Sequence, residues 1–253
     1  PKPRNPVPPK LFMPAGYSKT IVVFVFCAAV AAFCGQSAFA QGMLVPAGFP
    51  PQADSRFTVC IEDIGVRIEN NCASVNVTQV FRNDTGNQLA AAYIFTLPEN
   101  TISSGYYVWE DGVKSSGAHL LTVPAFCTKR VEVEYQMLIP VYDGLYRFNL
   151  PLLRDISVPI EEFSVSVSIS SSYPLQSLYS ECRDFQLFKP WQNSLKDGRY
   201  AFAGYFSASD FTPTGDCNIL FKAVPFGSDN GQIQLFTHKV QGEDGYFAVF
   251  LNP

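Results

Sequence analysis

The stretch TKRVEVEYQMLIPVYDGLYRFNL, residues 128–150, decides the fold class of this chain. Its apolar residues Val131, Val133 and Tyr135 alternate with charged ones, and the alternation resumes after Asp143-Gly144. A period of two places one apolar and one wet face on a β-strand and is incompatible with an amphipathic helix. Asp-Gly favours a type I′ turn, so the stretch predicts a long β-hairpin.

Composition favours an all-β fold and excludes some partners. The chain has 253 residues, of which 47% are hydrophobic, 16% charged and 14% aromatic, and aromatic side chains favour strands. Four of the 18 basic residues precede Gln41, so 14 remain against 22 acidic ones, a net charge of about −8 for the rest of the chain. Because nucleic-acid affinity depends mostly on clustered positive charge, we expect no nucleic-acid partner.

The beginning of the chain predicts export. We interpret residues 1–12 as upstream read-through, because the chain starts with Pro1 and Met13 is a suitable initiator. Lys19, an apolar run at 21–33 and the small residues before Gln41 then make 13–40 a signal peptide cleaved after Ala40. A run of about 13 residues is short for a membrane span, so a retained anchor is the weaker alternative, as is a lipoprotein signal at Cys34. We therefore expect a secreted, periplasmic or cell-surface protein with no membrane span after cleavage.

One domain is expected to follow a linker. Residues 41–55 contain glycine and three prolines, which predict an irregular linker. Residues 56–253 show no repeat, no composition break and no long stretch with a helical period. Besides 128–150, we predict strands at 57–68, 73–82, 91–97, 105–110, 120–123, 163–170, 185–188, 199–207, 218–224, 232–238 and 246–251. Asn70-Asn71 predicts a hairpin turn between the first two, and the whole pattern predicts a β-sandwich or related two-sheet fold.

Five cysteines remain after the expected leader: Cys60, Cys72, Cys127, Cys182 and Cys217. An oxidising compartment favours one or two disulfides, and an odd number leaves at least one thiol unpaired within the chain. Cys182 with Cys217 and Cys60 with Cys72 are the pairs we consider, although spacing alone does not determine connectivity. A zinc site is disfavoured because Cys-x-x-Cys is absent and both histidines are isolated.

No spacing in the chain indicates catalysis, and we assign no catalytic, cofactor or metal residues. His119 and His238 lack a neighbouring nucleophile motif, so we interpret both as exposed loop or edge residues. The acidic pairs Glu132/Glu134 and Glu161/Glu162 are interpreted as solvated. Two sequons, at Asn76 and Asn83, would accept glycan only in a eukaryotic secretory pathway.

Several motifs resemble those of one family. They are ASVNVTQVFRN (73–83), AAYIFTLPEN (91–100), TKRVEVEYQMLIP (128–140), GLYRFNLPL (144–152), FTPTGD (211–216) and GYFAVFLNP (245–253). Together they resemble the VIT domain, the module shared by vault proteins and inter-alpha-trypsin inhibitor heavy chains and found in many bacterial exported proteins. The resemblance spans about residues 56–253.

The resemblance implies an all-β, sandwich-like VIT domain with little or no helix outside the signal peptide. It implies that Tyr93, Phe95, Tyr135, Phe148 and Phe247 pack between sheets and that Arg130 pairs with a nearby acid. Many members carry a helix before the Arg-Val-x-Val-x-Tyr strand, but residues 113–127 are too short and too polar for it. The family usually continues into a von Willebrand type A domain, whose Asp-x-Ser-x-Ser motif does not occur here, so we interpret the chain as an amino-terminal fragment of such a protein.

Two function classes follow. The first is an exported, non-enzymatic interaction or structural module whose partner is a downstream type A domain or an extracellular protein. The alternative is a secreted β-sandwich enzyme, such as a glycan hydrolase, with Glu132, Glu134, Asp210 and Asp216 as its candidate carboxylates. Two of these carboxyls roughly 5 to 10 Å apart in a cleft would favour the enzyme.

Overall fold

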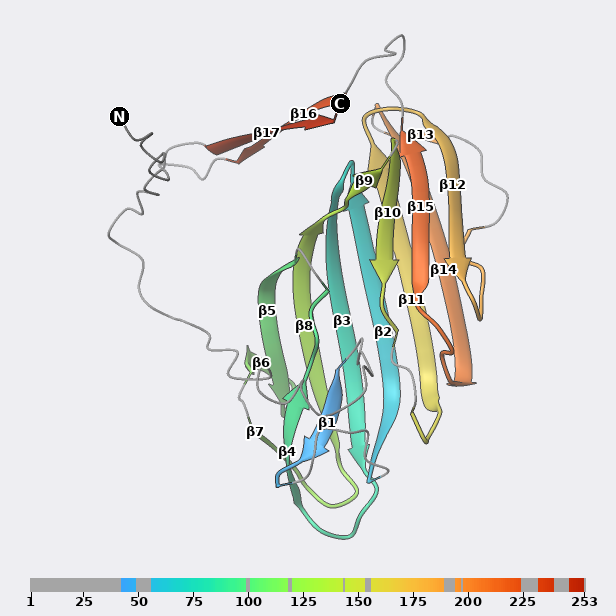
Figure 1. Ribbon diagram of the computed structural model, residues 1–253. Helices are drawn as coiled ribbons and strands as arrows, with labels where there is room; N and C mark the ends of the chain where they lie inside the picture. The colour runs from blue at the N-terminus through green and yellow to red at the C-terminus, as the bar shows by residue number, and fades with distance from the viewer. Residues whose placement is uncertain are drawn as a thin grey trace, which may run out of the picture. The chain divides into compact units, whose positions relative to one another are not determined.

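In the computed structural model the chain divides into two units, residues 1–38 and 39–253. The structure describes residues 42–48, 56–98, 101–117, 120–142, 144–152, 156–188, 194–196, 198–223, 232–238 and 246–252 (Figure 1). The expected read-through and signal peptide, residues 1–40, lie outside this part of the chain. Across the described ranges every regular element is a strand, which confirms the all-β fold class. Within the same residues no helix is long and apolar enough to cross a membrane.

An eight-stranded sheet, called here the large sheet, forms the backbone of the fold. Its strand order is β13-β14-β11-β2-β3-β8-β5-β6. The bounds are β2 Phe57–Glu69, β3 Cys72–Asn83, β5 Thr101–Glu110, β6 Val113–Ser116, β8 Thr128–Leu138, β11 Ile160–Ser171, β13 Ser194–Lys196 and β14 Arg199–Phe211. Its neighbours pair antiparallel except β11 and β2, which are parallel. Because parallel neighbours need a crossover connection, strands far apart in sequence meet at the centre of this sheet.

Smaller sheets cover the inner face of the large one. Four strands, in the order β12-β15-β10-β9, form one of them: β9 Val141–Tyr142, β10 Leu145–Leu150, β12 Leu175–Cys182 and β15 Cys217–Ala223. Three strands, in the order β1-β4-β7, form another: β1 Met43–Pro46, β4 Leu89–Ile94 and β7 Leu120–Val123. In Figure 1 β10, β15 and β12 lie in front of β11 and β14. Strands β16 Gln232–His238 and β17 Tyr246–Asn252 pair with each other as a separate hairpin.

The long hairpin predicted for residues 128–150 is wrong. Strand β8 pairs with β3 and β5 in the large sheet, whereas β10 pairs with β15 and β9 in the four-stranded sheet. The chain changes sheets at Ile139-Pro140, where proline cannot donate to a sheet ladder. Only the short hairpin of β9 and β10 forms at the predicted Asp-Gly turn, with Gly144 at a φ of 71°.

The hairpin predicted from Asn70-Asn71 is confirmed. Strands β2 and β3 pair along their full length around this turn, and Asn70 has a φ of 55°. The register shifts between Val59 and Ile61, so Cys60 is the extra residue of a bulge opposite Val80-Phe81. The bulge therefore lies in β2 rather than in β3.

The core lies between the sheets and joins residues from all three. Tyr135 on β8 and Phe148 on β10 are 2% and 0% exposed, as the resemblance implied. Tyr93 and Phe95 are partly buried and pack against the core, where Phe95 contacts Tyr135 at a ring distance of 6.1 Å. The side chain of Phe247 lies outside the described residues. Since the two halves of residues 128–150 face each other across this core, their shared alternation follows from burial rather than from mutual pairing.

Three local predictions need correction. Residues 43–46 were expected in an irregular linker but form β1, whose four residues are buried and which pairs with β4. Residues 185–188 are not a strand, although Leu187 and Phe188 are buried. The strand that precedes them is β12, which the sequence pattern did not reveal, because its exposed and buried residues follow no clean period of two.

Candidate functional site on the outer face of the large sheet

The outer face of the large sheet, turned away from the core, presents its side chains in rows across the strands. One row is set by the pairing of β8, β3, β2, β11 and β14 and consists of Glu134, Asn76, Gly65, Ser166 and Tyr205. The next row, toward the other end of the strands, contains Glu132, Thr78, Asp63 and Ser164. Because alternate residues of a strand share a face, the polar positions predicted as wet meet here.

A group of charged and aromatic side chains surrounds Glu132 at one side of this face. We call it the Glu132 cluster, and its members are Tyr107, Trp109, Lys114, Arg130, Glu132 and Glu134. Glu132 accepts hydrogen bonds from Lys114 Nζ at 3.1 Å, from Asn76 Nδ2 at 3.0 Å and from Trp109 Nε1 at 3.0 Å. Burial alone would raise the pKa of Glu132, but these three hydrogen bonds together hold it below its ordinary value.

Cations of the Glu132 cluster lie over its aromatic rings. The Arg130 guanidinium is 4.5 Å from the centre of the Trp109 ring, and Lys114 Nζ is 4.0 Å from the centre of the Tyr107 ring. Arg130 Nη2 also lies 4.0 Å from Glu132 Oε2, which confirms that Arg130 pairs with an acid. Each long side chain thus has at least two contacts, so the cluster is ordered before any partner arrives.

The acidic pair Glu132/Glu134 is bridged by a single cation. Lys114 Nζ contacts Glu134 Oε1 at 3.3 Å in addition to Glu132. Glu132 is less solvated than predicted, with only 8% of the residue exposed. A general acid needs a carboxyl that keeps its proton. The pKa of Glu132 is lowered, so this carboxyl releases its proton more readily than an ordinary one.

The other acidic pair, Glu161/Glu162, lies at the start of β11, and its two residues have different surroundings. Glu161 accepts two hydrogen bonds from Arg82, at 2.8 and 3.1 Å, and these lower its pKa. Arg82 Nε also donates to Asp84 at 2.6 Å. Glu162 is exposed.

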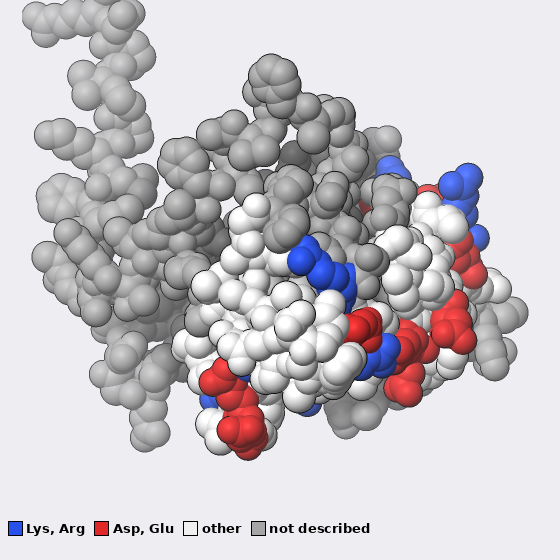
Figure 2. Space-filling view, turned by 90° about the horizontal axis from the view of Figure 1, so that it is seen from below, with Lys and Arg blue, Asp and Glu red and all other residues white. Residues whose placement is uncertain are grey.

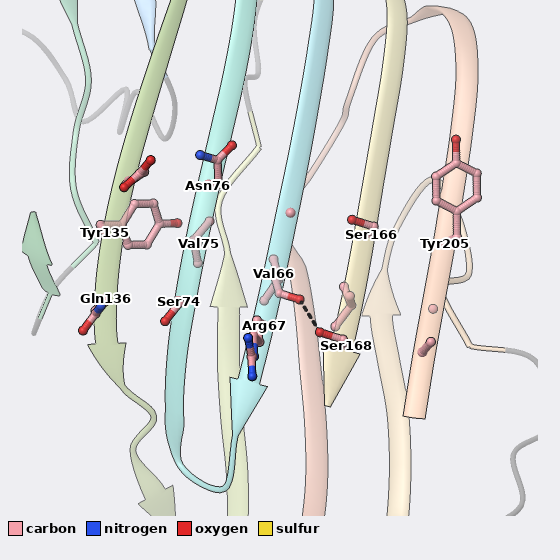
Figure 3. A pocket seen from close by; sticks show the side chains of 15 residues that line it. Val66, Arg67, Ser74, Val75, Asn76, Tyr135, Gln136, Ser166, Ser168 and Tyr205 are labelled. Carbon is pink, nitrogen blue, oxygen red and sulfur yellow. Dashed lines mark hydrogen bonds between the residues drawn. The ribbon is translucent and has the colours of Figure 1, made fainter. Parts of the chain in front are cut away.

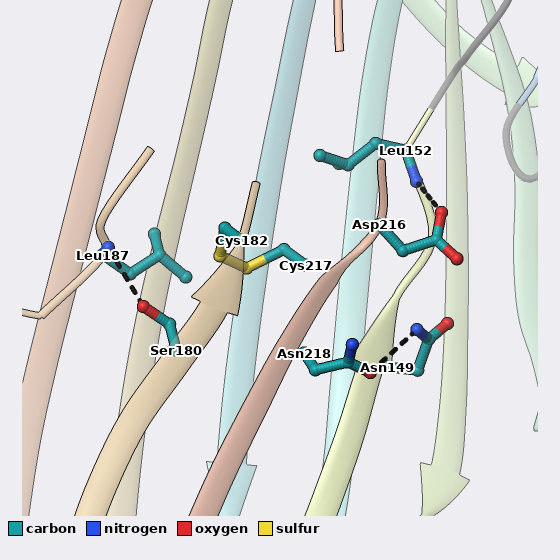
Figure 4. The surroundings of a disulfide bond; sticks show 8 residues. All are labelled: Asn149, Leu152, Ser180, Cys182, Leu187, Asp216, Cys217 and Asn218. Carbon is teal, nitrogen blue, oxygen red and sulfur yellow. Dashed lines mark hydrogen bonds between the residues drawn. A yellow bond between two sulfur atoms is a disulfide. The ribbon is translucent and has the colours of Figure 1, made fainter. Parts of the chain in front are cut away.

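The remaining carboxylates proposed for hydrolysis lie on separate elements. Asp210 is exposed near the end of β14 in the large sheet, with a φ of 51°. Asp216 precedes β15 of the four-stranded sheet and accepts a hydrogen bond from the Leu152 amide at 3.3 Å (Figure 4).

A buried carboxyl lies on the opposite, inner face, where no acid was predicted. Glu62 on β2 is 0% exposed; its Oε1 accepts from Gln79 Nε2 at 3.3 Å, and its Oε2 has no hydrogen-bond partner. Gln79 also donates to the Gly42 carbonyl at 3.1 Å and accepts from the Tyr93 hydroxyl at 2.7 Å. Burial raises the pKa of Glu62 to about 8. The sequence could have revealed this position: alternate residues of a strand share a face, and Glu62 is two residues before the inward-facing Ile64.

A hollow of about 740 Å³ lies in the middle of the outer face, beside the Glu132 cluster (Figure 3). Gly65, Ser74, Gln136, Ser166, Ser168 and Tyr205 are among the residues that line it. In Figure 3 Ser74, Ser166 and Ser168 lie on the central strands, and the Tyr205 ring lies on β14 at the edge of the group. The hollow is therefore shallow and open to solvent, and its lining combines apolar surface with exposed polar side chains.

One disulfide joins the four-stranded sheet. Cys182 on β12 and Cys217 on β15 are opposite each other in register and are bonded, which confirms this pair (Figure 4). Cys60, Cys72 and Cys127 are free.

The predicted pairing of Cys60 with Cys72 is wrong. Cys72 lies opposite Glu69, and Glu69 is nine residues, or about 30 Å, along β2 from Cys60. Burial raises the pKa of the Cys60 thiol to about 11, so it is a weak nucleophile.

Both sequon asparagines use their side chains within the fold. Asn83 is 0% exposed, and its Nδ2 lies within hydrogen-bonding distance of the carbonyls of Asn87, Val123 and Pro124. Asn76 donates to Glu132. Asn83 therefore holds the end of β3 to the loop before β8.

The histidines add no chemistry to this site. His119 and the side chain of His238 lie outside the described residues. Among the residues that the structure describes, no three His, Cys, Asp or Glu side chains are grouped as a metal site would require. On the surface seen in Figure 2, acidic and basic side chains lie next to each other at the lower edge and on the right side of the described area, and much of the rest is uncharged.

Among the solved structures that match the chain, three examples are remote in sequence and have TM-scores below 0.5. A putative nutrient binding protein from Legionella pneumophila matches with a TM-score of 0.44 and 10% identity, covering 72% of this chain and 71% of that one. An M1 zinc metallopeptidase from Deinococcus radiodurans and aminopeptidase A from Legionella pneumophila each match with a TM-score of 0.36 and 10% identity. This chain spans 49% and 24% of these two peptidases, and 79% of this chain is covered in each case. None of these likenesses extends to function.

One family model matches part of the chain. No curated protein matches the chain. Residues 63–120, from β2 to the start of β7, match the family model described as the Vault protein inter-alpha-trypsin domain. This range includes the Phe81-Arg82-Asn83 motif, whose asparagine anchors the end of β3. The resemblance drawn from the sequence is thus confirmed over residues 63–120, and its motifs beyond residue 120 lie outside the match.

Proposed function

We propose that this chain is an exported, non-enzymatic protein-interaction module whose binding surface is the Glu132 cluster. The observation that carries the proposal is the preorganised group of Trp109, Arg130 and Lys114 around one carboxylate on an exposed sheet face. Tryptophan, tyrosine and arginine are the residue types enriched at interface hot spots. Since these side chains are already held by mutual contacts, they lose little conformational entropy when a partner binds.

A non-enzymatic role is supported by the state of the candidate acids. Lys114 contacts both Glu132 and Glu134, and Arg82 contacts Glu161. The pKa values of Glu132 and Glu161 are held below the ordinary value, which makes these two carboxyls poor proton donors. The first partner to test is a von Willebrand type A domain encoded in the same reading frame beyond Pro253, and the second is a separate extracellular protein.

The proposed surface is tested by crosslinking the purified chain through its lysines to the type A domain or to proteins of the medium into which the host exports it. We expect crosslinks from Lys114, in the Glu132 cluster, rather than from Lys222 on β15. Trp109→Ala should remove them, and Tyr179→Ala, a matched exposed aromatic on β12, should leave them unchanged. Crosslinks through Lys222 that persist in Trp109→Ala would refute the proposed surface.

Export has its own measurement. Amino-terminal sequencing of the protein recovered outside the cytoplasm should begin at Gln41. A product that retains residues 13–40 would refute cleavage after Ala40.

A further inference from the structure

We propose that the hollow centred on Gly65 binds a neutral oligosaccharide, a ligand class distinct from the protein partner assigned to the Glu132 cluster. The hollow crosses β14, β11, β2, β3 and β8. Four strand spacings make it about 19 Å long, enough for a short oligosaccharide lying across the strands.

Nothing in the fold requires glycine at position 65. It lies in the interior of central strand β2, where glycine weakens a sheet. An added Cβ would meet nothing nearer than Ser166 Oγ at 3.9 Å and the Asn76 carbonyl at 4.0 Å, so a side chain fits. A missing side chain that neither sterics nor a positive φ requires is expected where a ligand approaches the backbone closely.

The polar groups around Gly65 suit hydroxyl groups. Ser74, Gln136 and Ser166 are exposed, and among the described residues their side chains have no hydrogen-bond partner in the protein. Serine and glutamine side chains both donate and accept, as sugar hydroxyls do. An extended peptide would instead seek free backbone groups, and those of the central strands are already paired in ladders.

Tyr205 supplies an aromatic surface at the end of the same row. It is 64% exposed and pairs in register with Ser166, which is next to Gly65. Tyrosine offers an apolar ring face with a polar tip, which matches a sugar ring with its C–H face and hydroxyl edge. An exposed aromatic ring beside the exposed Ser166 therefore provides stacking together with hydrogen bonding.

The charges beside the hollow are already neutralised. Arg67 Nη2 contacts Glu69 Oε1 at 2.5 Å, and Glu134 Oε1 contacts Lys114 Nζ at 3.3 Å. An acidic or basic ligand would have to compete with these partners. A neutral oligosaccharide would not.

The test is calorimetric titration of the purified chain with neutral hexasaccharides of β-1,4-glucan, β-1,4-mannan and α-1,4-glucan, and with an acidic galacturonate hexamer. At least one neutral probe should bind with a dissociation constant below about 1 mM. Gly65→Val should weaken its binding at least about tenfold by filling the hollow. Tyr205→Ala should weaken it about two- to tenfold, and the exposed control Tyr179→Ala should leave it unchanged.

Further measurements distinguish effects on folding, on saccharide binding and on the crosslinks to a protein partner. Gly65→Val should melt at or above the wild-type temperature, because the position tolerates a side chain, so lost binding is not lost folding. Trp109→Ala should keep saccharide binding, and Gly65→Val should keep the Lys114 crosslinks. The inference is overturned if no neutral probe binds the folded chain, if the galacturonate binds more tightly than the neutral probes, or if Gly65→Val binds as the wild type does.

Discussion

Replacing the buried Glu62 by glutamine should stabilise the protein at neutral pH. Glutamine has nearly the same shape and can still accept the hydrogen bond from Gln79 at its Oε1. It carries no charge at any pH, whereas an ionised Glu62 places a charge in the core without a cation beside it among the described residues. The Oε2 of Glu62 has no hydrogen-bond partner, and the side-chain nitrogen of glutamine would have none there either, so both proteins bury an unpaired polar group.

The size of the effect follows from the pKa of Glu62, which is about 8 in the folded protein against an ordinary value of 4.5. Below pH 4.5 both states hold the proton and the carboxyl carries no charge penalty. Between pH 4.5 and 8 the unfolded chain releases the proton that the folded chain retains, so wild-type stability falls as pH rises. At about 1.36 kcal/mol for each unit, the loss at pH 7 is roughly 3 kcal/mol, and it levels off above pH 8.

The assay is urea denaturation of wild type and Glu62→Gln at pH 4.5, 6, 7 and 8.5. We expect nearly equal stability at pH 4.5 and a gap that widens to roughly 3 kcal/mol at pH 7 in favour of the variant. Glu181→Gln, an exposed control on β12, should stay within about 0.5 kcal/mol of wild type throughout. A variant less stable than wild type at pH 7, or a gap that does not change with pH, would mean that folding does not raise the pKa of Glu62 and would refute the reasoning.

Three further predictions concern the connections between elements. Replacing both Cys182 and Cys217 by alanine should cost roughly 2 to 4 kcal/mol in urea denaturation, and dithiothreitol should lower the melting temperature of wild type but not of the variant. Asn83→Ala should cost at least about 2 kcal/mol, because it leaves buried carbonyls of the loop before β8 without their donor; a change below 0.5 kcal/mol would contradict that role. Lys114→Met should raise the pKa of Glu132, measured by NMR titration of its carboxyl carbon, because burial then acts with one cationic hydrogen bond fewer; an unchanged pKa would mean that Trp109 and Asn76 suffice.

Local pattern was a good guide to strands and a poor guide to their partners. The Asn70-Asn71 hairpin was predictable because its two strands are neighbours in sequence and in space. In residues 128–150 the same kind of pattern misled, since alternation records which side chains are buried but not which strand lies alongside. Strand β1 was missed because the prolines and glycines around it are typical of irregular segments. Its four residues are buried, so the strand is stabilised by the core that it covers.

The candidate site was predictable in its members but not in its arrangement. The sequence placed Glu132, Glu134 and Arg130 on one wet strand face, yet Trp109 and Lys114 reach Glu132 from β5 and β6. The hollow could not be predicted, because its centre depends on the parallel neighbours β2 and β11, which lie about 100 residues apart in sequence. Glu62 could have been recognised by parity as an acid on an apolar face.

By itself the sequence indicated that this chain is all-β, that it carries motifs resembling those of the VIT domain, and that Cys182 with Cys217 was one of two candidate pairs. The tertiary structure alone decided that residues 128–150 divide between two sheets, that Cys60 and Cys72 lie at opposite ends of a hairpin, and that Gly65 opens a hollow. The physical reason is that periodicity encodes burial one residue at a time. Strand order, register and the meeting of distant side chains arise only when whole sheets pack together.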